Sequence, residues 1–345
     1  MYSVGIIGLG AIAAGYGSPD ETGPYVHAGG INQSEQVDLK GACDLMPEAI
    51  DRFKDKWGGC FNDCSYFTDP EEMLSTVKPD IVAICVKGPY HFPVLQTVIA
   101  AKPKAIFLEK PPLCSLAECD QIVAAAKAAG ISITVSYSRH WGPHVLRMAD
   151  LVREGLIGKV QQVTGYCGGA FLSFASHTTD MICQFAGYDP VRVFASGDVG
   201  QDEDGQKDGY EAEPSINNMI IEFASGISAT QIGYKGPYGG FCVEVIGEKG
   251  CVVVPFYGVP TAVDADKNSI DLSGMDVPEW NSTSPFKHAY DQIATMLDGG
   301  PPADCTDATF HAVNEIGFAG IESVHTNSAI ELPNKRRERV IWANG

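Results

Sequence analysis

The first third of the chain alternates short apolar runs with stretches of helical periodicity. The apolar runs are rich in β-branched residues, which predicts strands buried on both faces. The stretches between them repeat apolar residues at a spacing of three and four, which predicts amphipathic helices. Strands that alternate with helices indicate a parallel sheet covered on both faces. The predicted strands are residues 3–7, 37–43, 81–86, 105–108 and 131–136, and the predicted helices are residues 47–57, 70–76, 90–101 and 115–129.

The pattern changes after Gly142-Pro143, where apolar and polar residues begin to alternate along longer runs. Period-two alternation means that one face of a sheet is solvated or covered by a partner, which predicts a mostly antiparallel sheet. Residues 201–214 are polar and acidic and are expected to form a surface loop. The predicted strands are residues 159–167, 215–223, 227–233 and 241–246, and the predicted helices are residues 144–153, 176–185, 286–298 and 308–327.

The fold class that follows is α/β with two domains. Residues 1–138 form a doubly wound domain, and residues 139–345 form an α+β domain with a large, mostly antiparallel open sheet. A length of 345 residues agrees with two domains, at roughly 150 residues each. Hydrophobic residues make up 45% of the chain and charged residues 19%, as in ordinary globular proteins.

The charge of the chain excludes some partners. With 24 Lys+Arg against 43 Asp+Glu, the net charge is −19, which repels phosphate backbones and anionic lipid. The longest apolar runs, residues 79–86 and 251–255, fall short of the roughly 20 residues that cross a bilayer. We therefore expect neither a nucleic-acid partner nor a membrane span. The first residues carry no basic leader, which favours a cytoplasmic protein.

The cysteine and histidine spacings do not predict a metal site. The 11 cysteines are an odd number, and several lie inside apolar runs, where a free thiol acts as a small hydrophobe. His140 and His144 have the spacing of one helical turn, but Pro143 between them opposes a shared helix face. We expect no metal. Two cysteine pairs lack a matching second pair at zinc-ligand spacing: Cys60-x3-Cys64 and Cys114-x4-Cys119.

A glycine-rich turn directly follows the first predicted strand. Its sequence is Gly8-Leu9-Gly10-Ala11-Ile12-Ala13. A Gly-x-Gly turn at this place lets the backbone approach a pyrophosphate at the start of the next helix. The third glycine of the usual fingerprint is replaced by Ala13, a small residue that is accepted there. The alternative is an ordinary glycine turn without a ligand.

Asp44 ends the second predicted strand. A carboxylate at this position binds the ribose hydroxyls of NAD and repels the 2′-phosphate of NADP, so NAD is favoured. Asp44 lies farther from Gly8 than the usual separation of about 20 residues. A Gly/Pro-rich insertion at residues 15–30, which contains Tyr25 and His27, accounts for the excess. Alternatively, Asp44 caps the helix that begins near Pro47.

Lys110 lies in the sequence Glu109-Lys110-Pro111, where the fourth predicted strand ends. Ligands of open α/β sheets bind outside the carboxyl ends of the strands, so a lysine there is placed to meet a substrate. A lysine can act as a general acid or base on a hydroxyl group. A surface lysine before a proline turn is the alternative interpretation.

Taken in order, several motifs resemble the glucose–fructose oxidoreductase / inositol 2-dehydrogenase / MocA family over nearly the whole chain. The resemblance implies an N-terminal Rossmann domain, a C-terminal open-sheet domain, and NAD(P)-dependent oxidation or reduction of a sugar or cyclitol. It also implies that Lys110 contacts the reacting hydroxyl and that Pro111 follows a cis peptide bond, as the equivalent proline often does in the family. The motifs are Gly8-x-Gly10, Asp44, Gly88-Pro89-Tyr90-His91, Glu109-Lys110-Pro111, residues 138–143, His177-x-x-Asp180 and residues 244–250.

The resemblance and the local spacing together assign the remaining site residues. His177 and Asp180 lie one helical turn apart and can face one crevice, although a histidine satisfied within the core is the alternative. The family commonly has an aspartate four residues before this histidine; Ser173 stands there and can hydrogen-bond a hydroxyl but holds no charge. The predicted catalytic residues are Lys110 and His177. The predicted substrate-binding residues are Ser173, Asp180, Arg139 and His140. The alternative for Arg139 and His140 is an ordinary hinge at the start of the second domain. The predicted cofactor residues are Gly8, Gly10, Ala11, Ile12, Asp44, Val86, His91 and Glu109.

The expected function is an NAD-dependent oxidoreductase that moves a hydride between nicotinamide and a carbon–OH of a sugar or cyclitol, with Lys110 and His177 relaying the proton. The second sheet is expected to pair two copies into a homodimer or homotetramer. Two alternatives stay open: a relative that acts on a dihydrodiol or tetrapyrrole, and a non-catalytic dinucleotide-binding sensor. Ser173 in place of the usual carboxylate motivates the sensor.

Overall fold

A computed structural model describes residues 1–201, 206–234, 236 and 239–344. The chain divides into two compact units. Unit 1 comprises Met1–Leu113, Glu118–Ser136 and Asn281–Asp307, and unit 2 comprises Cys114–Ala117, Tyr137–Trp280 and Ala308–Gly345. Among the described helices, none combines the length and the apolar character that a membrane crossing requires.

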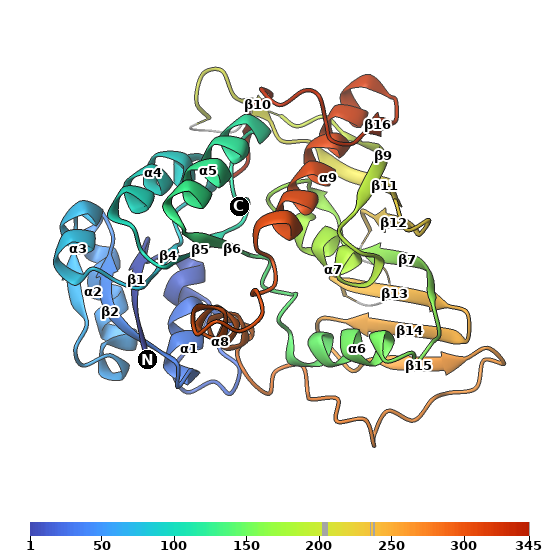
Figure 1. The fold of residues 1–345 in the computed structure, drawn as a ribbon, viewed down its shortest axis with the longest axis horizontal. Coiled ribbons are helices and arrows are strands. Elements are labelled where there is room, and N and C mark those ends of the chain that lie inside the picture. Colours follow the sequence, from blue (N-terminus) through green and yellow to red (C-terminus); the bar gives the residue numbers. More distant parts are fainter. Residues whose placement is uncertain (202–205, 235, 237–238, 345) are drawn as a thin grey trace. The chain divides into compact units, whose positions relative to one another are not determined.

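Six parallel strands form the sheet of unit 1, in the order β3-β2-β1-β4-β5-β6 (Figure 1). This order, in which the chain starts in the middle and changes direction between β1 and β4, is that of a dinucleotide-binding doubly wound sheet. Strands β4 and β5 are buried at every position, as the continuous apolar runs predicted. The strands are β1 (Tyr2–Ile7), β2 (Val37–Cys43), β3 (Ser65–Phe67), β4 (Ile81–Ile84), β5 (Ala105–Glu109) and β6 (Ser132–Ser136), and the helices between them are α2 (Pro47–Trp57), α3 (Pro70–Val77), α4 (His91–Ala101) and α5 (Leu116–Ala129), with short turns η2 (Gly58–Cys60) and η3 (Gly88–Tyr90).

The segment after β1 departs from one continuous helix. A five-residue π-helix, η1 (Ala11–Gly15), comes first, and the helix α1 (His27–Gln33) begins at the end of the predicted insertion. Helix α1 packs against α8 (Pro285–Leu297), which also belongs to unit 1. The close approach of α1 to α8 requires a glycine at position 30, because a Cβ at Gly30 would lie 2.4 Å from the Cβ of Phe286. The division into residues 1–138 and 139–345 therefore differs from the observed units at α8.

The sheet of unit 2 has the order β15-β14-β13-β7-β12-β11-β9-β16, with β8 paired to β11. Among its described strands, β7 and β12 are parallel and the other pairs are antiparallel, which confirms the predicted mostly antiparallel sheet. Five strands were missed, namely β8, β9, β14, β15 and β16. The strands are β7 (Val160–Tyr166), β8 (Gly169–Ala170), β9 (Pro190–Asp198), β11 (Ser215–Phe223), β12 (Ser228–Ile232), β13 (Cys242–Gly247), β14 (Gly250–Pro255), β15 (Thr261–Asp264) and β16 (Ile330–Glu331), and the helices are α6 (Pro143–Arg153), α7 (Ser176–Ala186) and α9 (Asp307–Thr326).

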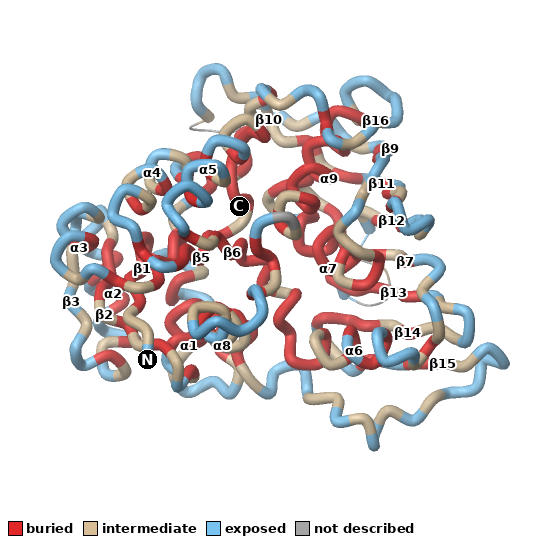
Figure 2. Tube along the Cα trace, viewed as in Figure 1, coloured by how far each residue is buried: buried red, intermediate tan, exposed pale blue. Residues whose placement is uncertain are grey.

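Helix α7 lies against one face of this sheet, over β7, β12 and β13 (Figure 1). A Cβ at Gly165 would lie 2.7 Å from side-chain atoms of Thr178 and Ile182, so the glycine lets the helix approach the strand. On β9, β11 and β13, residues that alternate with the buried ones expose Phe194, Ile220 and Ile246. Figure 2 shows α7, which covers the other face, in the red of buried residues. One face of the sheet is therefore covered by helices and the other carries exposed apolar side chains.

The polar segment before β11 is more ordered than the surface loop expected for residues 201–214. Residues 202–205 lie outside the described residues. Glu211–Ala212 instead form a strand, β10, which pairs in parallel with β17 (Ile341–Trp342). The acidic composition of this segment suggested full solvation, but backbone pairing with the end of the chain holds its last residues in place.

Candidate active site

Gly8 ends β1 in a backbone conformation that only glycine adopts readily, with φ of +91°. A Cβ there would lie 2.8 Å from backbone atoms of Cys85 and Val86, so the turn packs directly on the end of β4. At Gly10, in contrast, a Cβ would meet no described atom within 4 Å. Gly10 and Ala11 are exposed and Ile12 follows within η1. This open backbone at the carboxyl end of β1 fits the approach of a dinucleotide pyrophosphate.

Asp44 joins the glycine turn to the end of β2. Its carboxylate accepts a hydrogen bond from the backbone N–H of Leu9 at 2.7 Å and another from that of Met46 at 2.9 Å. The alternative interpretation of Asp44 as the cap of α2 is wrong, because Met46 is the residue at that cap position. Asp44 is therefore fixed beside Gly10, with carboxylate lone pairs left for further donors.

A cavity of 380 Å³ lies beside the same turn. Leu9, Gly10 and Ala11 line one part of it, and Arg52 and Lys56 of α2 line another. The two cations were not singled out from the sequence, because they lie one and two turns into a helix whose apolar face is its main signal. They place positive charge near the glycine turn.

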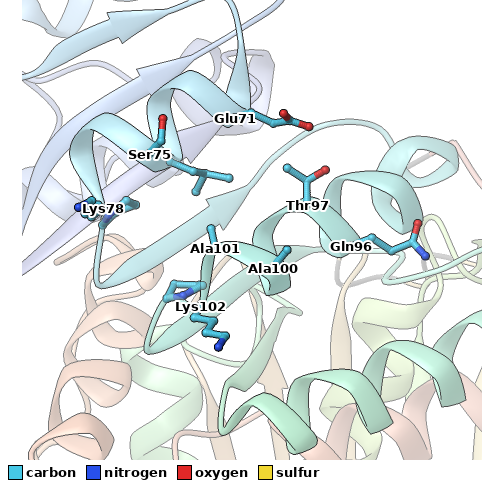
Figure 3. Close-up of a pocket in the computed structure, with 11 residues that line it drawn as sticks. Glu71, Ser75, Lys78, Gln96, Thr97, Ala100, Ala101 and Lys102 are labelled. Atoms are coloured by element: carbon cyan, nitrogen blue, oxygen red, sulfur yellow. The ribbon is translucent and has the colours of Figure 1, made fainter.

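A larger cavity of 820 Å³ lies between α3 and α4, where Figure 3 shows Ser75 and Thr97 on facing helices. Lys78 and Lys102, at the carboxyl ends of these helices, also line it. The strands β4 and β5 begin just after these lysines, so this cavity lies at the amino ends of the strands. Cofactors of such sheets bind at the opposite ends, and the larger cavity is therefore not the candidate site.

The end of β5 is held by a buried chain of hydrogen bonds. Glu109 accepts from His27 Nε2 at 2.9 Å, and His27 Nδ1 lies 2.9 Å from the hydroxyl of Tyr290. His27 and Tyr290 are fully buried and Glu109 is 4% exposed. The Tyr290 hydroxyl can donate to His27 Nδ1 or accept from it, so both ring nitrogens of His27 are engaged within the network. The half-buried Lys110 follows directly at the edge of this network.

The electrostatics of this network favour an ionised Glu109. Burial opposes the charge, but the hydrogen bond from His27, the electrostatic attraction of His27 and the positive charge of Lys110 together outweigh burial and hold the pKa of Glu109 below its ordinary value. Burial raises the pKa of Tyr290 well above its ordinary value, which keeps the phenol protonated as a donor. Lys110 therefore follows a buried carboxylate whose position and charge are both set by residues from the insertion and from α8.

His91 joins the end of β4 to the segment after Lys110. Its Nε2 lies 2.8 Å from the carbonyl oxygen of Val86, and its Nδ1 lies 2.9 Å and 3.1 Å from those of Pro111 and Pro112. Burial lowers the pKa of His91 and outweighs the carbonyl oxygens, which favour protonation. The fully buried ring of His91 therefore ties the end of β4 to the segment after Lys110, and its contact with a cofactor stays a prediction.

In unit 2 the structure brings Arg139 and His177 together. The guanidinium nitrogen of Arg139 lies 2.6 Å from His177 Nε2. A guanidinium only donates, so His177 accepts at Nε2 and carries its proton on Nδ1. The guanidinium carbon of Arg139 lies 4.2 Å from the ring centroid of Phe241, whose ring meets the imidazole of His177 edge to face at a centroid distance of 5.8 Å. The Nε2 lone pair of His177 is thus engaged, which makes this histidine a weaker candidate for a general base.

His140 and Asp180, two further predicted substrate residues, form a separate buried pair. His140 Nδ1 lies 2.9 Å from the carboxylate of Asp180, and the hydroxyl of Tyr188 donates to the other carboxylate oxygen at 3.2 Å. Asp180 is fully buried and His140 is 3% exposed. His177 and Asp180 therefore point to different partners, although they lie one turn apart on α7.

Ser173 meets a carboxylate that sequence reasoning missed. Its hydroxyl donates to Glu213 at 2.5 Å, and its backbone N–H donates to the same carboxylate at 2.9 Å. The position where relatives commonly carry an aspartate thus has a carboxylate in contact with it, supplied from elsewhere in the chain. The one sequence signal was an acidic segment, which predicts solvation more often than a site.

Comparison with known proteins agrees with this geometry. Residues 2–137 match the oxidoreductase family with an NAD-binding Rossmann fold, GFO_IDH_MocA. The fold and the glycine turn are those of an NAD-binding oxidoreductase. Residues 2–137 are thus similar to the NAD-binding part of the Gfo/Idh/MocA oxidoreductase family, the family that the motifs resemble.

Individual relatives are distant. The chain is 25% identical over 280 residues to a myo-inositol 2-dehydrogenase of Thermotoga maritima, covering 76% of this chain and 78% of the relative. The crystal structure of aldose-aldose oxidoreductase from Caulobacter crescentus complexed with glycerol has a TM-score of 0.74 at 19% identity, covering 96% of this chain and 99% of that one. A levoglucosan dehydrogenase in complex with NADH and levoglucosan has a TM-score of 0.74 at 16% identity, with coverage of 96% and 100%.

Proposed function

We propose that this protein is an NAD-dependent dehydrogenase that oxidises a CH–OH group of a sugar or cyclitol to a carbonyl, or catalyses the reverse reduction. The observation that carries the proposal is the placement of Lys110 at the carboxyl end of β5, next to a carboxylate fixed by His27. Bound NAD supplies the hydride acceptor. In the oxidation, the deprotonated amine of Lys110 takes up the hydroxyl proton while the hydride leaves the same carbon for NAD, so the substrate loses one hydride and one proton. In the reduction, the ammonium form of Lys110 returns the proton to the alkoxide oxygen.

NAD is the proposed cofactor in preference to NADP. The carboxylate of Asp44, held by Leu9 and Met46, is placed to accept from ribose hydroxyls and to repel a 2′-phosphate. Arg52 and Lys56 beside the neighbouring cavity are the cations that a 2′-phosphate could use. A preference for NADP in steady-state kinetics would overturn the proposal and point to these two side chains.

The substrate residues are proposed to come from unit 2. Arg139, His177 and Ser173 carry the donors and acceptors that a polyol needs. We assign His177 the role of orienting a hydroxyl and Lys110 the proton transfer, because Arg139 engages His177 Nε2. The buried pair of His140 and Asp180 supports the helix that carries His177.

The test begins with NAD binding by calorimetry and continues with NADH formation on myo-inositol, scyllo-inositol, D-glucose and levoglucosan. Lys110→Ala should lower kcat by at least about 100-fold, the contribution typical of a positioned general base, and leave NAD affinity nearly unchanged. Lys104→Ala is the matched control, because Lys104 precedes the same strand but pairs with Asp80 at the surface. A Lys110→Ala kcat above about a tenth of wild type would overturn the site assignment.

The same assay, with a dihydrodiol added to the substrate panel, separates the two alternatives. NAD binding without turnover of any member of the panel would favour the dinucleotide-binding sensor. Turnover of a dihydrodiol in place of the polyols would favour the relative with a non-sugar substrate.

We also propose that the open face of the unit 2 sheet pairs two copies of the chain. Phe194, Ile220 and Ile246 are 40%, 45% and 37% exposed on that face, and Phe194 lies opposite Ile220 on the neighbouring strand, so a second copy would cover adjoining apolar side chains there. A cytoplasmic location is proposed as well, because all eleven cysteines are free thiols and most are buried.

A further inference from the structure

Two lysines occupy equivalent places on the connections that lead from α3 and α4 into the sheet of unit 1. Lys78 directly follows α3 and precedes β4, and Lys102 directly follows α4 and precedes β5. The first residues of these two strands, Ile81 and Ala105, pair with each other. The two connections therefore run side by side, and both lysines line the cavity of 820 Å³ between α3 and α4.

Both lysines adopt a backbone conformation that residues other than glycine rarely take. The φ angle of Lys78 is +50° and that of Lys102 is +56°, in the left-handed region. A residue that takes this conformation after a helix is usually glycine, which has no Cβ to cause strain. A strained residue type that recurs at two matching places indicates a use for its side chain there.

The charges of these two lysines are not neutralised by a described carboxylate. Within the described part of the chain, neither Lys78 nor Lys102 forms an ion pair. Asp80 follows Lys78 by two positions, but Lys104 holds its carboxylate at 2.9 Å. The backbone N–H and the hydroxyl of Ser3 also donate to Asp80, at 2.9 and 2.8 Å. The two ammonium groups therefore remain available to an anion in the cavity.

The rest of the cavity wall is mostly uncharged. Figure 3 shows Glu71 and Lys78 at opposite ends of α3, with Ser75 between them. Glu71 and Lys78 are separated by about 10 Å along the helix, at 1.5 Å per residue. On α4, Thr97 contributes a hydroxyl group to the wall and Gln96 an amide. The cavity thus has a positively charged end and a polar, mostly neutral body.

We propose that this cavity binds a small hydroxylated phosphate ester, with the phosphate at Lys78 and Lys102 and the hydroxyl groups at Thr97 and Gln96. Its volume of 820 Å³ lies within the range of about 300–1,000 Å³ that is usual for ligand pockets. A phosphate suits two lysines, because each lysine acts as a point charge, whereas a planar carboxylate is matched by the arginine fork. The site lies at the amino ends of β4 and β5, away from the proposed cofactor and substrate residues.

The test is isothermal titration calorimetry with D-glucose 6-phosphate and glycerol 3-phosphate, in the presence of saturating NAD so that the dinucleotide site is filled. We expect saturable binding of an ester, about tenfold weaker binding of inorganic phosphate because it lacks the hydroxyl contacts, and no binding of D-glucose. The net charge of −19 repels anions in general, so saturable binding requires local positive charge. Added salt should weaken the binding.

Variants then assign the binding to the cavity. Lys78→Gln and Lys102→Gln should each weaken it about tenfold or more, because each removes a charge-assisted hydrogen bond. Ala100→Glu, at an exposed position of the cavity wall, adds a negative charge and should abolish binding. Lys127→Gln is the matched control, because Lys127 lies in the last turn of another unit 1 helix, α5, and does not line the cavity.

Each outcome decides the proposal, whether or not the protein turns over any substrate. Loss of binding in both lysine variants, with binding kept in Lys127→Gln, supports it. Absence of saturable binding, equal affinity for inorganic phosphate, or unchanged affinity in the lysine variants overturns it and leaves the two lysines as charges that stabilise the carboxyl ends of their helices. If a lysine variant does not fold, as circular dichroism will show, Ala100→Glu decides, and binding that persists in it overturns the proposal.

Discussion

Replacing His27 with phenylalanine should destabilise unit 1 through charge and not through volume. The ring of His27 lies among Phe107, Phe286 and Tyr290, with centroids 4.8, 4.5 and 5.9 Å away, so a phenyl ring fits a site already built from aromatic rings. The substitution removes the donor to Glu109 and leaves a carboxylate that is 4% exposed. Breaking a buried pair by removing one partner costs about 3–5 kcal/mol.

The loss of stability in His27→Phe should depend on pH, and the direction of this dependence follows from the pKa of Glu109. In wild type the pKa of Glu109 is below its ordinary value, so the pair stabilises the fold above the unfolded pKa and this stabilisation is lost as the pH falls through the folded pKa. Without His27, burial opposes the charged form and the pKa of Glu109 rises. The deficit of the variant should therefore be largest near neutral pH and shrink as acid protonates Glu109.

The assay is urea unfolding followed by circular dichroism, at neutral pH and near the pKa of a free glutamate. His27→Phe should lose about 3 kcal/mol or more at neutral pH, and Glu109→Gln on that background should recover part of the loss because it removes the buried charge. Tyr2→Phe, which removes an exposed hydroxyl bonded to Asp298 in the same unit, serves as the control. An equal deficit at both pH values, or no recovery in the double variant, would refute the electrostatic account.

Three further outcomes are expected. Asp44→Ala should raise the KM for NAD about tenfold or more and narrow the discrimination against NADP, as steady-state kinetics with both cofactors will show. Acidification below about pH 6.5 should lower the free energy of unfolding, because burial lowers the pKa of His91 and His144 below that of a histidine in the unfolded chain. The decrease should reach up to about 1.4 kcal/mol per pH unit for each buried histidine. A free energy of unfolding that stays constant down to about pH 5 contradicts this. Phe194→Glu should shift the light-scattering mass toward the monomer, and a wild-type monomer at micromolar concentration would count against the sheet interface.

Local signals in the sequence were sufficient for much of the fold. Helix α2 has the predicted bounds, because a proline opens it and apolar residues recur at helical spacing. Strand β11 also has its predicted bounds, because alternation persists over nine residues. The parallel sheet of unit 1 was predicted from the alternation of strands and helices, whereas the three-residue strand β3 was missed because it is too short to leave a pattern.

Long-range partners could not be predicted in the same way. His27 meets Tyr290 across 263 positions, and Ser173 meets Glu213 across 40. Neither pair has a periodic or compositional signal, since a single hydrogen bond leaves no pattern along the chain. The amphipathic pattern of α8 predicted a helix, but such a pattern does not state which core the apolar face covers. The roles of the residues named from motifs stay predictions until the variants are measured.

The position of α8 bears on how the protein folds as it is made. Unit 1 needs α8 to cover α1 and to supply Tyr290 to His27, yet residues 137–280 are translated between the last strand of its sheet and that helix. At about 5–20 residues per second, the nascent first unit waits on the order of 7–30 s with the surface of α1 and the buried imidazole uncovered. During that interval it is the part of the nascent chain that a ribosome-associated chaperone would engage, and a fragment ending near residue 138 would remain in that incomplete state.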